Sequence, residues 1–169
     1  MHSPNRFRRL SNSPTDPRSA AADLARLRAG ATVLRVALGS TMFAHGLLKV
    51  VVFGMPGTVA FFVAQGFPAW TAWLVTAAEL GGGAALVAGL LVRAVALAFL
   101  PILAGVVATL APNGFWFDAA GGGGWEFPAV LMLGMVAQAL AGPGHLALGA
   151  WLARRRAATP DGAASRLAA

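Results

Sequence analysis

Residues 31–53 read ATVLRVALGSTMFAHGLLKVVVF, a long apolar segment in which only Arg35, His45 and Lys49 can carry a charge. At about 1.5 Å per residue, a helix of this length covers roughly 34 Å. A bilayer core is about 30 Å thick, so the segment is long enough to cross it. The segment therefore predicts a membrane-spanning helix.

Three more apolar segments predict further spans, at residues 70–91, 94–111 and 126–147. Between the first two spans, residues 54–69 (GMPGTVAFFVAQGFPA) carry Gly and Pro at both ends, a pattern typical of a short interfacial or re-entrant helix. The predicted fold is an all-α integral membrane four-helix bundle.

Composition and charge agree with a membrane protein. The chain is 57% hydrophobic and 11% charged, whereas an ordinary soluble domain is about 25% charged. The net charge of +7 is concentrated in the two tails, which argues against a nucleic-acid partner and for a lipid bilayer. We expect residues 1–29 to form a disordered basic arm, residues 30–152 the membrane domain, and residues 153–169 a disordered basic tail. The chain has no cysteine, which excludes disulfides and thiolate metal sites within it.

The basic residues predict the topology. With both termini cytoplasmic, every Lys and Arg except Lys49 lies on or near the cytoplasmic side, as the positive-inside rule requires. Arg35 and Arg93 are expected to anchor span ends to lipid headgroups. Tryptophans gather at the predicted outer boundary (Trp70, Trp73, Trp116, Trp125), with Trp151 at the inner one. We predict a multi-pass protein of the cell membrane.

Four ionisable residues are predicted to meet in one layer of the bundle. From the inner surface, His45 lies roughly 21 Å and Lys49 roughly 27 Å up the first span. Glu79 lies roughly 13 Å below the outer surface, and Glu126 opens the fourth span near that surface. Because His45 and Lys49 are four residues apart, they share one helix face, and a pairing with Glu79 would make both charges easier to keep in lipid.

Structural interpretations of the same residues remain open. Lys49 can extend to the interface, and His45 can donate to a nearby carbonyl. Glu79 can belong to an ion pair without catalytic work, and Glu126 can stabilise a helix N-terminus. The three His residues are scattered and make no metal-ligand set.

In their order and spacing, several short segments resemble the DoxX family over about residues 31–149. These segments are Arg35-Val-Ala-Leu-Gly39, His45-Gly-Leu-Leu-Lys49, Gly66-Phe-Pro68, Glu79-Leu-Gly-Gly82, Gly89-Leu-Leu-Val-Arg93, Gly124-Trp-Glu126 and Gly142-Pro-Gly144.

The resemblance implies four membrane helices and an association with redox complexes. Some relatives are quinone-linked subunits of sulfur-compound oxidoreductases, while others partner oxidative-stress enzymes or act as membrane chaperones and cargo receptors. The family's recurrent polar positions match His45, Lys49, Glu79 and Glu126 in this chain. The cofactor is left unknown, with a quinone as the candidate.

The expected function is that of a membrane subunit of a redox system that binds a quinone or similar small molecule in the outer half of the bundle. Lys49 and His45 would hydrogen-bond or polarise a carbonyl, while Glu79, with Glu126, would exchange protons with it. A protein partner would complete any electron transfer, and whether the chain itself is catalytic is left open. The alternatives are a non-catalytic membrane scaffold or chaperone and, third, a small transporter.

Overall fold

The computed structural model describes residues 17–116 and 123–157, and every regular element in this part is helical. The prediction of an all-α fold is confirmed. In chain order the elements are α1 (Pro17–Leu47), a π-helical turn (Leu48–Val52), α2 (Gly54–Ala64), α3 (Ala69–Ala88), α4 (Val92–Leu110), a 3-10 turn (Ala111–Asn113), α5 (Glu126–Ala141) and α6 (Leu148–Ala157).

Three of these helical stretches are long and apolar enough to cross a membrane: Pro17–Val52, Ala69–Ala88 and Val92–Asn113. They contain nearly all of the first three predicted spans. Their outward faces carry large apolar side chains that the described residues leave more than half exposed, among them Val33, Val51, Leu74 and Leu97. A soluble monomer rarely exposes so much contiguous apolar surface, whereas hydrocarbon is a suitable solvent for it.

The fourth predicted segment, residues 126–147, is not one continuous helix. Helix α5 ends at Ala141 because Gly142 adopts a φ of 79° and Pro143 has no N–H group to continue the ladder. With 16 residues, α5 is shorter than the three candidate spans. The chain then runs without regular structure to α6.

The two tails also differ from the prediction where they are described. Helix α1 already begins at Pro17, so the second half of the supposed disordered arm is helical. Proline is favoured in the first turn of a helix, and the Ala- and Leu-rich stretch behind it favours helix. Residues 153–157 are likewise the end of α6. The rest of both tails, residues 1–16 and 158–169, lies outside the described residues.

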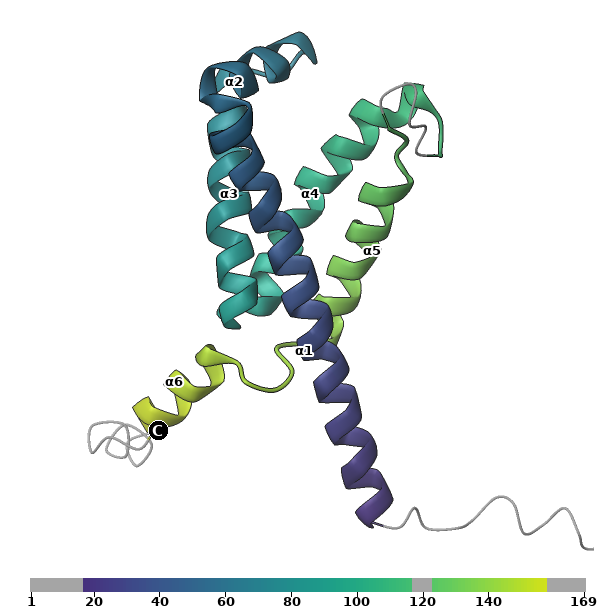
Figure 1. Cartoon of the computed structure of the whole chain (residues 1–169). Coiled ribbons are helices and arrows are strands. Elements are labelled where there is room, and N and C mark those ends of the chain that lie inside the picture. The colour runs from purple at the N-terminus through teal and green to yellow at the C-terminus, as the bar shows by residue number, and fades with distance from the viewer. Residues whose placement is uncertain (1–16, 117–122, 158–169) are drawn as a thin grey trace, which may run out of the picture.

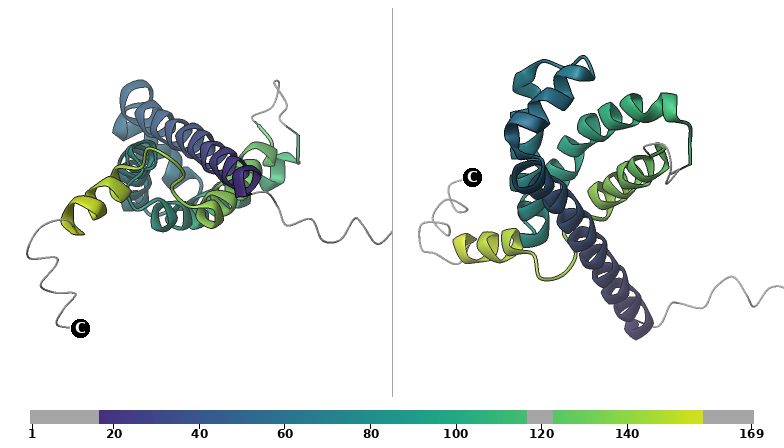
Figure 2. Two further views of the ribbon diagram at one scale, coloured as in Figure 1. Left: turned by 90° about the horizontal axis from the view of Figure 1, so that it is seen from below. Right: turned by 45° about the horizontal axis from the view of Figure 1, so that its top comes forward.

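The helices pack as two antiparallel pairs, α1 with α3 and α4 with α5 (Figure 1). Figures 1 and 2 show the start of α1, the α3–α4 turn and α6 at one end of the molecule, with α2 and the end of α4 at the other. The apolar core lies where the pairs meet and comprises Leu38, Met42, Leu86, Val92, Ala96, Phe99, Leu103, Leu131 and Met135.

Glycines allow the close approach of α1 and α3. A Cβ atom on Gly83 would lie 2.6 Å from the Phe43 backbone nitrogen, and one on Gly39 would lie 2.9 Å from the Gly83 carbonyl oxygen. Small residues at helix contacts are a common feature of membrane bundles because they let two backbones touch. This contact fixes which α1 side chains face α3, including those near the C-terminal end of α1.

Candidate functional site

The strongest polar contact between α1–α2 and α3 is an ion pair. Lys49 Nζ donates to both carboxylate oxygens of Glu79, at 2.8 Å to Oε1 and 2.7 Å to Oε2. The Glu79 side chain is 5% exposed and that of Lys49 is 17% exposed. A buried carboxylate needs a partner of this kind, so the two charges stabilise each other in an apolar setting. The hypothesis that Lys49 pairs with Glu79 is confirmed by this geometry.

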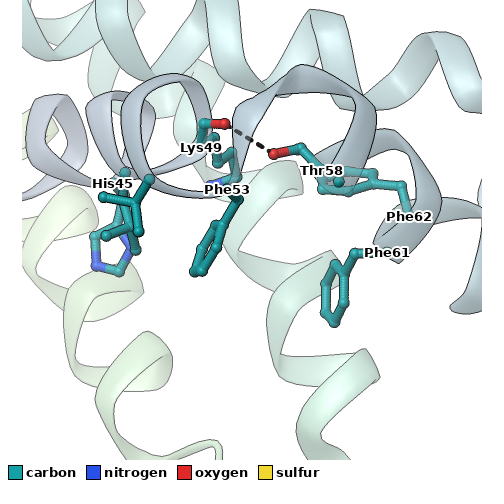
Figure 3. Close-up of a pocket in the computed structure, with 9 residues that line it drawn as sticks. His45, Lys49, Phe53, Thr58, Phe61 and Phe62 are labelled. Carbon is teal, nitrogen blue, oxygen red and sulfur yellow. Dashed lines mark hydrogen bonds between the residues drawn. The ribbon is translucent and has the colours of Figure 1, made fainter.

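Lys49 is held by local structure that follows α1. It lies in the π-helical turn, where the Phe53 N–H donates to the Leu48 carbonyl oxygen over 3.1 Å. Such turns are rare and frequently occur at functional sites. The buried hydroxyl of Thr58, on α2, donates to the Lys49 carbonyl oxygen over 3.0 Å (Figure 3). Thr58 thus ties α2 back to the residue that carries the cation.

We expect Thr58→Val to lower the free energy of unfolding by about 1 kcal/mol, because it removes one buried hydrogen bond and leaves the Lys49 carbonyl without that donor. Thr41→Val is the matched control, since the Thr41 hydroxyl bonds only to the Ala37 carbonyl of its own helix turn. Thermal unfolding of the purified variants in detergent measures both. Equal melting temperatures for the two variants would contradict the inference that the Thr58 hydrogen bond stabilises the packing of α2 against the π-helical turn.

A cavity of about 630 Å³ lies beside Lys49, under the π-helical turn and α2. Its apolar wall is largely aromatic, and in Figure 3 the side chains of His45, Phe53 and Phe61 project to the same side of the α1–α2 segment. The lining residues are His45, Leu48, Lys49, Val52, Phe53, Gly57, Thr58, Phe61 and Phe62. This volume lies within the range of about 300–1,000 Å³ typical of small-molecule sites. The cavity therefore combines an apolar wall with the polar groups of His45, Lys49 and Thr58.

The four predicted site residues are placed differently with respect to this cavity. His45 and Lys49 line it, whereas Glu79 contacts it only through Lys49. Glu126 is absent from its lining and begins α5, where its backbone N–H donates to the Phe115 carbonyl oxygen over 3.0 Å. The neighbouring Phe127 ring lies 6.4 Å from the His45 ring, centroid to centroid, so α5 begins near the cavity.

Some residues of this region were not predicted as site residues. Thr58, Phe61 and Phe62 belong to a segment assigned only as an interfacial or re-entrant helix, and no spacing rule links that segment to Lys49; Phe53 is the last residue of the predicted first span. The structure brings them together because α2 folds back after the π-helical turn. Among residues 17–116 and 123–157, no group of three His, Cys, Asp or Glu side chains is close enough to hold a metal ion.

The expectation that Arg35 anchors a span end to lipid headgroups is corrected by the structure. Arg35 is only 2% exposed, and its Nη2 atom lies 3.5 Å from the carbonyl oxygens of His145 and Leu146. The guanidinium packs against Gly89, where a Cβ atom would overlap it. A signal for this burial was present, because Arg35 is four residues from Ala31 and three from Leu38, both on the buried face of α1.

Comparisons with known proteins give three findings. A family model described as DoxX matches residues 30–112. The chain is 37% identical over 119 residues to a Bacillus subtilis (strain 168) protein named "Putative oxidoreductase CatD", and the alignment covers 70% of this chain and 84% of that protein. No solved structure shows a significant match to the chain.

Proposed function

Because this chain belongs to the DoxX family, we propose that it is a membrane subunit of a redox system and binds a quinone in the cavity beside Lys49. The observation that carries the proposal is the position of a buried ion pair at the edge of an aromatic cavity. The similarity to a protein named as an oxidoreductase supports the redox part.

The cavity suits a flat, lipid-soluble carbonyl compound. Phe53, Phe61 and Phe62 offer ring faces for stacking, while His45 and Lys49 offer donors to a carbonyl oxygen. Phe53 and Phe61 are more than half exposed on the outward surface, so a ligand can enter from the bilayer rather than from water. A quinone, when bound, would supply two-electron carrier chemistry coupled to protons.

The protein's part in this chemistry is to bind, orient and exchange protons. Lys49 Nζ stands between the cavity and the carboxylate, within hydrogen-bond reach of both Glu79 oxygens. A proton given up by Lys49 would have to be replaced from outside the pair, because the Glu79 carboxylate accepts from Lys49 through both oxygens and has none to donate. Glu79 would instead hold the Lys49 ammonium at the edge of the cavity, and His45 can hold the ligand's carbonyl in place. A protein partner would deliver or accept the electrons, because the chain has no cysteine for thiol–disulfide exchange of its own.

The proposal includes four membrane crossings in the cell membrane, with both termini in the cytoplasm. Its support is that the start of α1, the α3–α4 turn and α6 lie at one end of the molecule (Figure 1), and that these elements hold most of the basic residues that the structure describes. Helix α5 would complete the fourth crossing. At about 1.5 Å per residue it covers roughly 24 Å, so local thinning of the bilayer or the segment that follows would make up the difference.

The function is tested by quinone binding to the purified protein in nanodiscs. We expect isoprenoid quinone in an organic extract of the wild type, and binding of a short-chain quinone weakened at least about tenfold in Lys49→Met, the loss of one charge-assisted hydrogen bond. Asp23→Asn, which breaks an exposed ion pair at the other end of α1, is the control and should bind like the wild type. Absence of quinone binding by the wild type would overturn the proposal.

A second candidate is a non-catalytic membrane scaffold or chaperone. The observation that favours it is the completeness of the ion pair: both Glu79 oxygens already accept from Lys49, so the pair needs no ligand for its stability. Under this hypothesis, a partner protein and no quinone would co-purify with the wild type.

A further inference from the structure

Helix α6 (Leu148–Ala157, LGAWLARRRA) stands apart from the helix pairs and carries both large apolar and cationic side chains. Leu148, Trp151 and Leu152 fall on one side of the helix by their spacing of three and four residues. They are 42%, 42% and 37% exposed, so nothing in the described structure covers them fully. The three consecutive arginines follow directly, and the sequence has no acidic residue between Glu126 and Asp161.

The start of α6 is fixed to the end of a membrane helix. The Gly149 N–H donates to the Gly89 carbonyl oxygen over 3.2 Å, and Gly89 is the C-cap of α3. Ala147, just before α6, is buried. Figure 1 shows α6 leaving this point obliquely, turned away from the direction of α3. If α3 crosses a bilayer, α6 therefore begins at the surface at which α3 ends.

The side chains of α6 suit that depth. The Arg155 guanidinium lies over the Trp151 ring, 4.0 Å from its centroid, and Arg154 is exposed. Tryptophan favours the membrane–water boundary, and arginine extends its charge from an apolar surface toward headgroups. Arg155 lies four residues after Trp151, on the apolar side of α6, and reaches toward the headgroups by extending over the Trp151 ring, whereas Arg154 lies beside that side. Short helices that combine apolar side chains with Lys or Arg bind in the interface plane, most strongly where the lipids are anionic.

We propose that α6 is an interfacial helix that binds the anionic phospholipid headgroups of the leaflet at which α3 ends. Leu148, Trp151 and Leu152 enter the boundary of the acyl chains, while Arg154 and Arg155 contact lipid phosphates. The inference rests on the membrane assignment and is independent of quinone binding.

The cysteine-free chain allows a direct test on the full-length protein. Spin labels are placed singly in Leu148→Cys, Leu152→Cys, Ala150→Cys and Ala153→Cys, and the protein is reconstituted in phosphatidylcholine nanodiscs with or without phosphatidylglycerol. With the anionic lipid present, we expect labels at the first two positions to be accessible to oxygen and shielded from a water-soluble nickel chelate. Labels at the other two positions, on the opposite side of the helix, should show the reverse.

The charge contribution is measured in the double variant Arg154→Gln/Arg155→Gln. We expect the ratio of lipid-bound to free α6 to fall about 30-fold in phosphatidylglycerol nanodiscs, which is about 1 kcal/mol for each arginine. Arg26→Gln/Arg28→Gln removes the same charge from α1 and should leave α6 bound. Nickel access at all four positions, oxygen access that does not depend on phosphatidylglycerol, or equal effects of the two double variants would each overturn the proposal.

Discussion

Gly83→Ala is expected to lower the free energy of unfolding by about 3 kcal/mol, because the added methyl group has no room between α1 and α3. Its Cβ would lie 2.6 Å from the Phe43 nitrogen and 2.8 Å from the Gly39 carbonyl oxygen. Both are backbone atoms, so no side chain can rotate away to make space. The two helices must separate, and the core contacts of Met42 and Leu86 weaken with them.

The control for this substitution lies in the same helix. A Cβ on Gly81 meets nothing within 4 Å, so Gly81→Ala should be neutral or stabilise the helix by about 0.5–1 kcal/mol. Thermal unfolding and resistance to SDS, followed by circular dichroism, give the comparison. If the two variants unfold alike, the close packing of α1 on α3 is not what holds the fold together.

Lys49→Met is expected to lower the free energy of unfolding by about 3 kcal/mol, because it leaves the Glu79 carboxylate buried without a cation. Replacing both partners, in Lys49→Met/Glu79→Met, removes the uncompensated charge and should recover most of this loss. Glu79→Met alone should cost less than Lys49→Met, since the Lys49 side chain is the more exposed of the two and can extend to the interface.

The exposed ion pair of Asp23 and Arg26 is the reference for this double-mutant cycle of Lys49 and Glu79. Its side chains are 66% and 82% exposed, so Asp23→Asn should change stability by less than about 0.5 kcal/mol. Denaturation by SDS of the single and double variants gives the coupling energy. Additive losses in the double variant would mean that Lys49 and Glu79 do not act as a pair.

The double variant also separates the two functional candidates. A folded Lys49→Met/Glu79→Met protein that no longer binds quinone supports a ligand-binding role for these residues. A folded double variant that keeps its protein partner, from a wild type that holds no quinone, supports a scaffold.

The sequence was informative wherever solvent alone decides the structure. Long apolar runs must be helical in hydrocarbon, where every backbone N–H and carbonyl needs a partner within the same segment. The three long apolar helices and the short helix after the first could therefore be predicted, the second and third long helices within a few residues, although α1 begins at Pro17 rather than near residue 31. Glu79 also stood out, because a charge at that depth is unfavourable without a partner.

Contacts between distant segments were harder to predict. Arg35 had the spacing of a buried residue, but only the packing of Gly89 and the chain near His145 against it explains how an arginine fits there. The end of α5 at Ala141 has a local cause in Gly142 and Pro143, but a proline can also kink a helix that continues, so the sequence alone did not decide between these outcomes.

By itself, the sequence determined that the described part of this chain is helical with an apolar exterior, and that His45 and Lys49 share a helix face near the depth of Glu79. The reason is that hydropathy and helical period are properties of neighbouring residues. Only the tertiary structure decided that Lys49 pairs with Glu79, that Thr58 and the aromatic side chains line a cavity beside Lys49, and that Glu126 lies outside this lining. These outcomes depend on how far each helix runs and at what angle the chain turns, and such quantities are set by packing between segments distant in sequence.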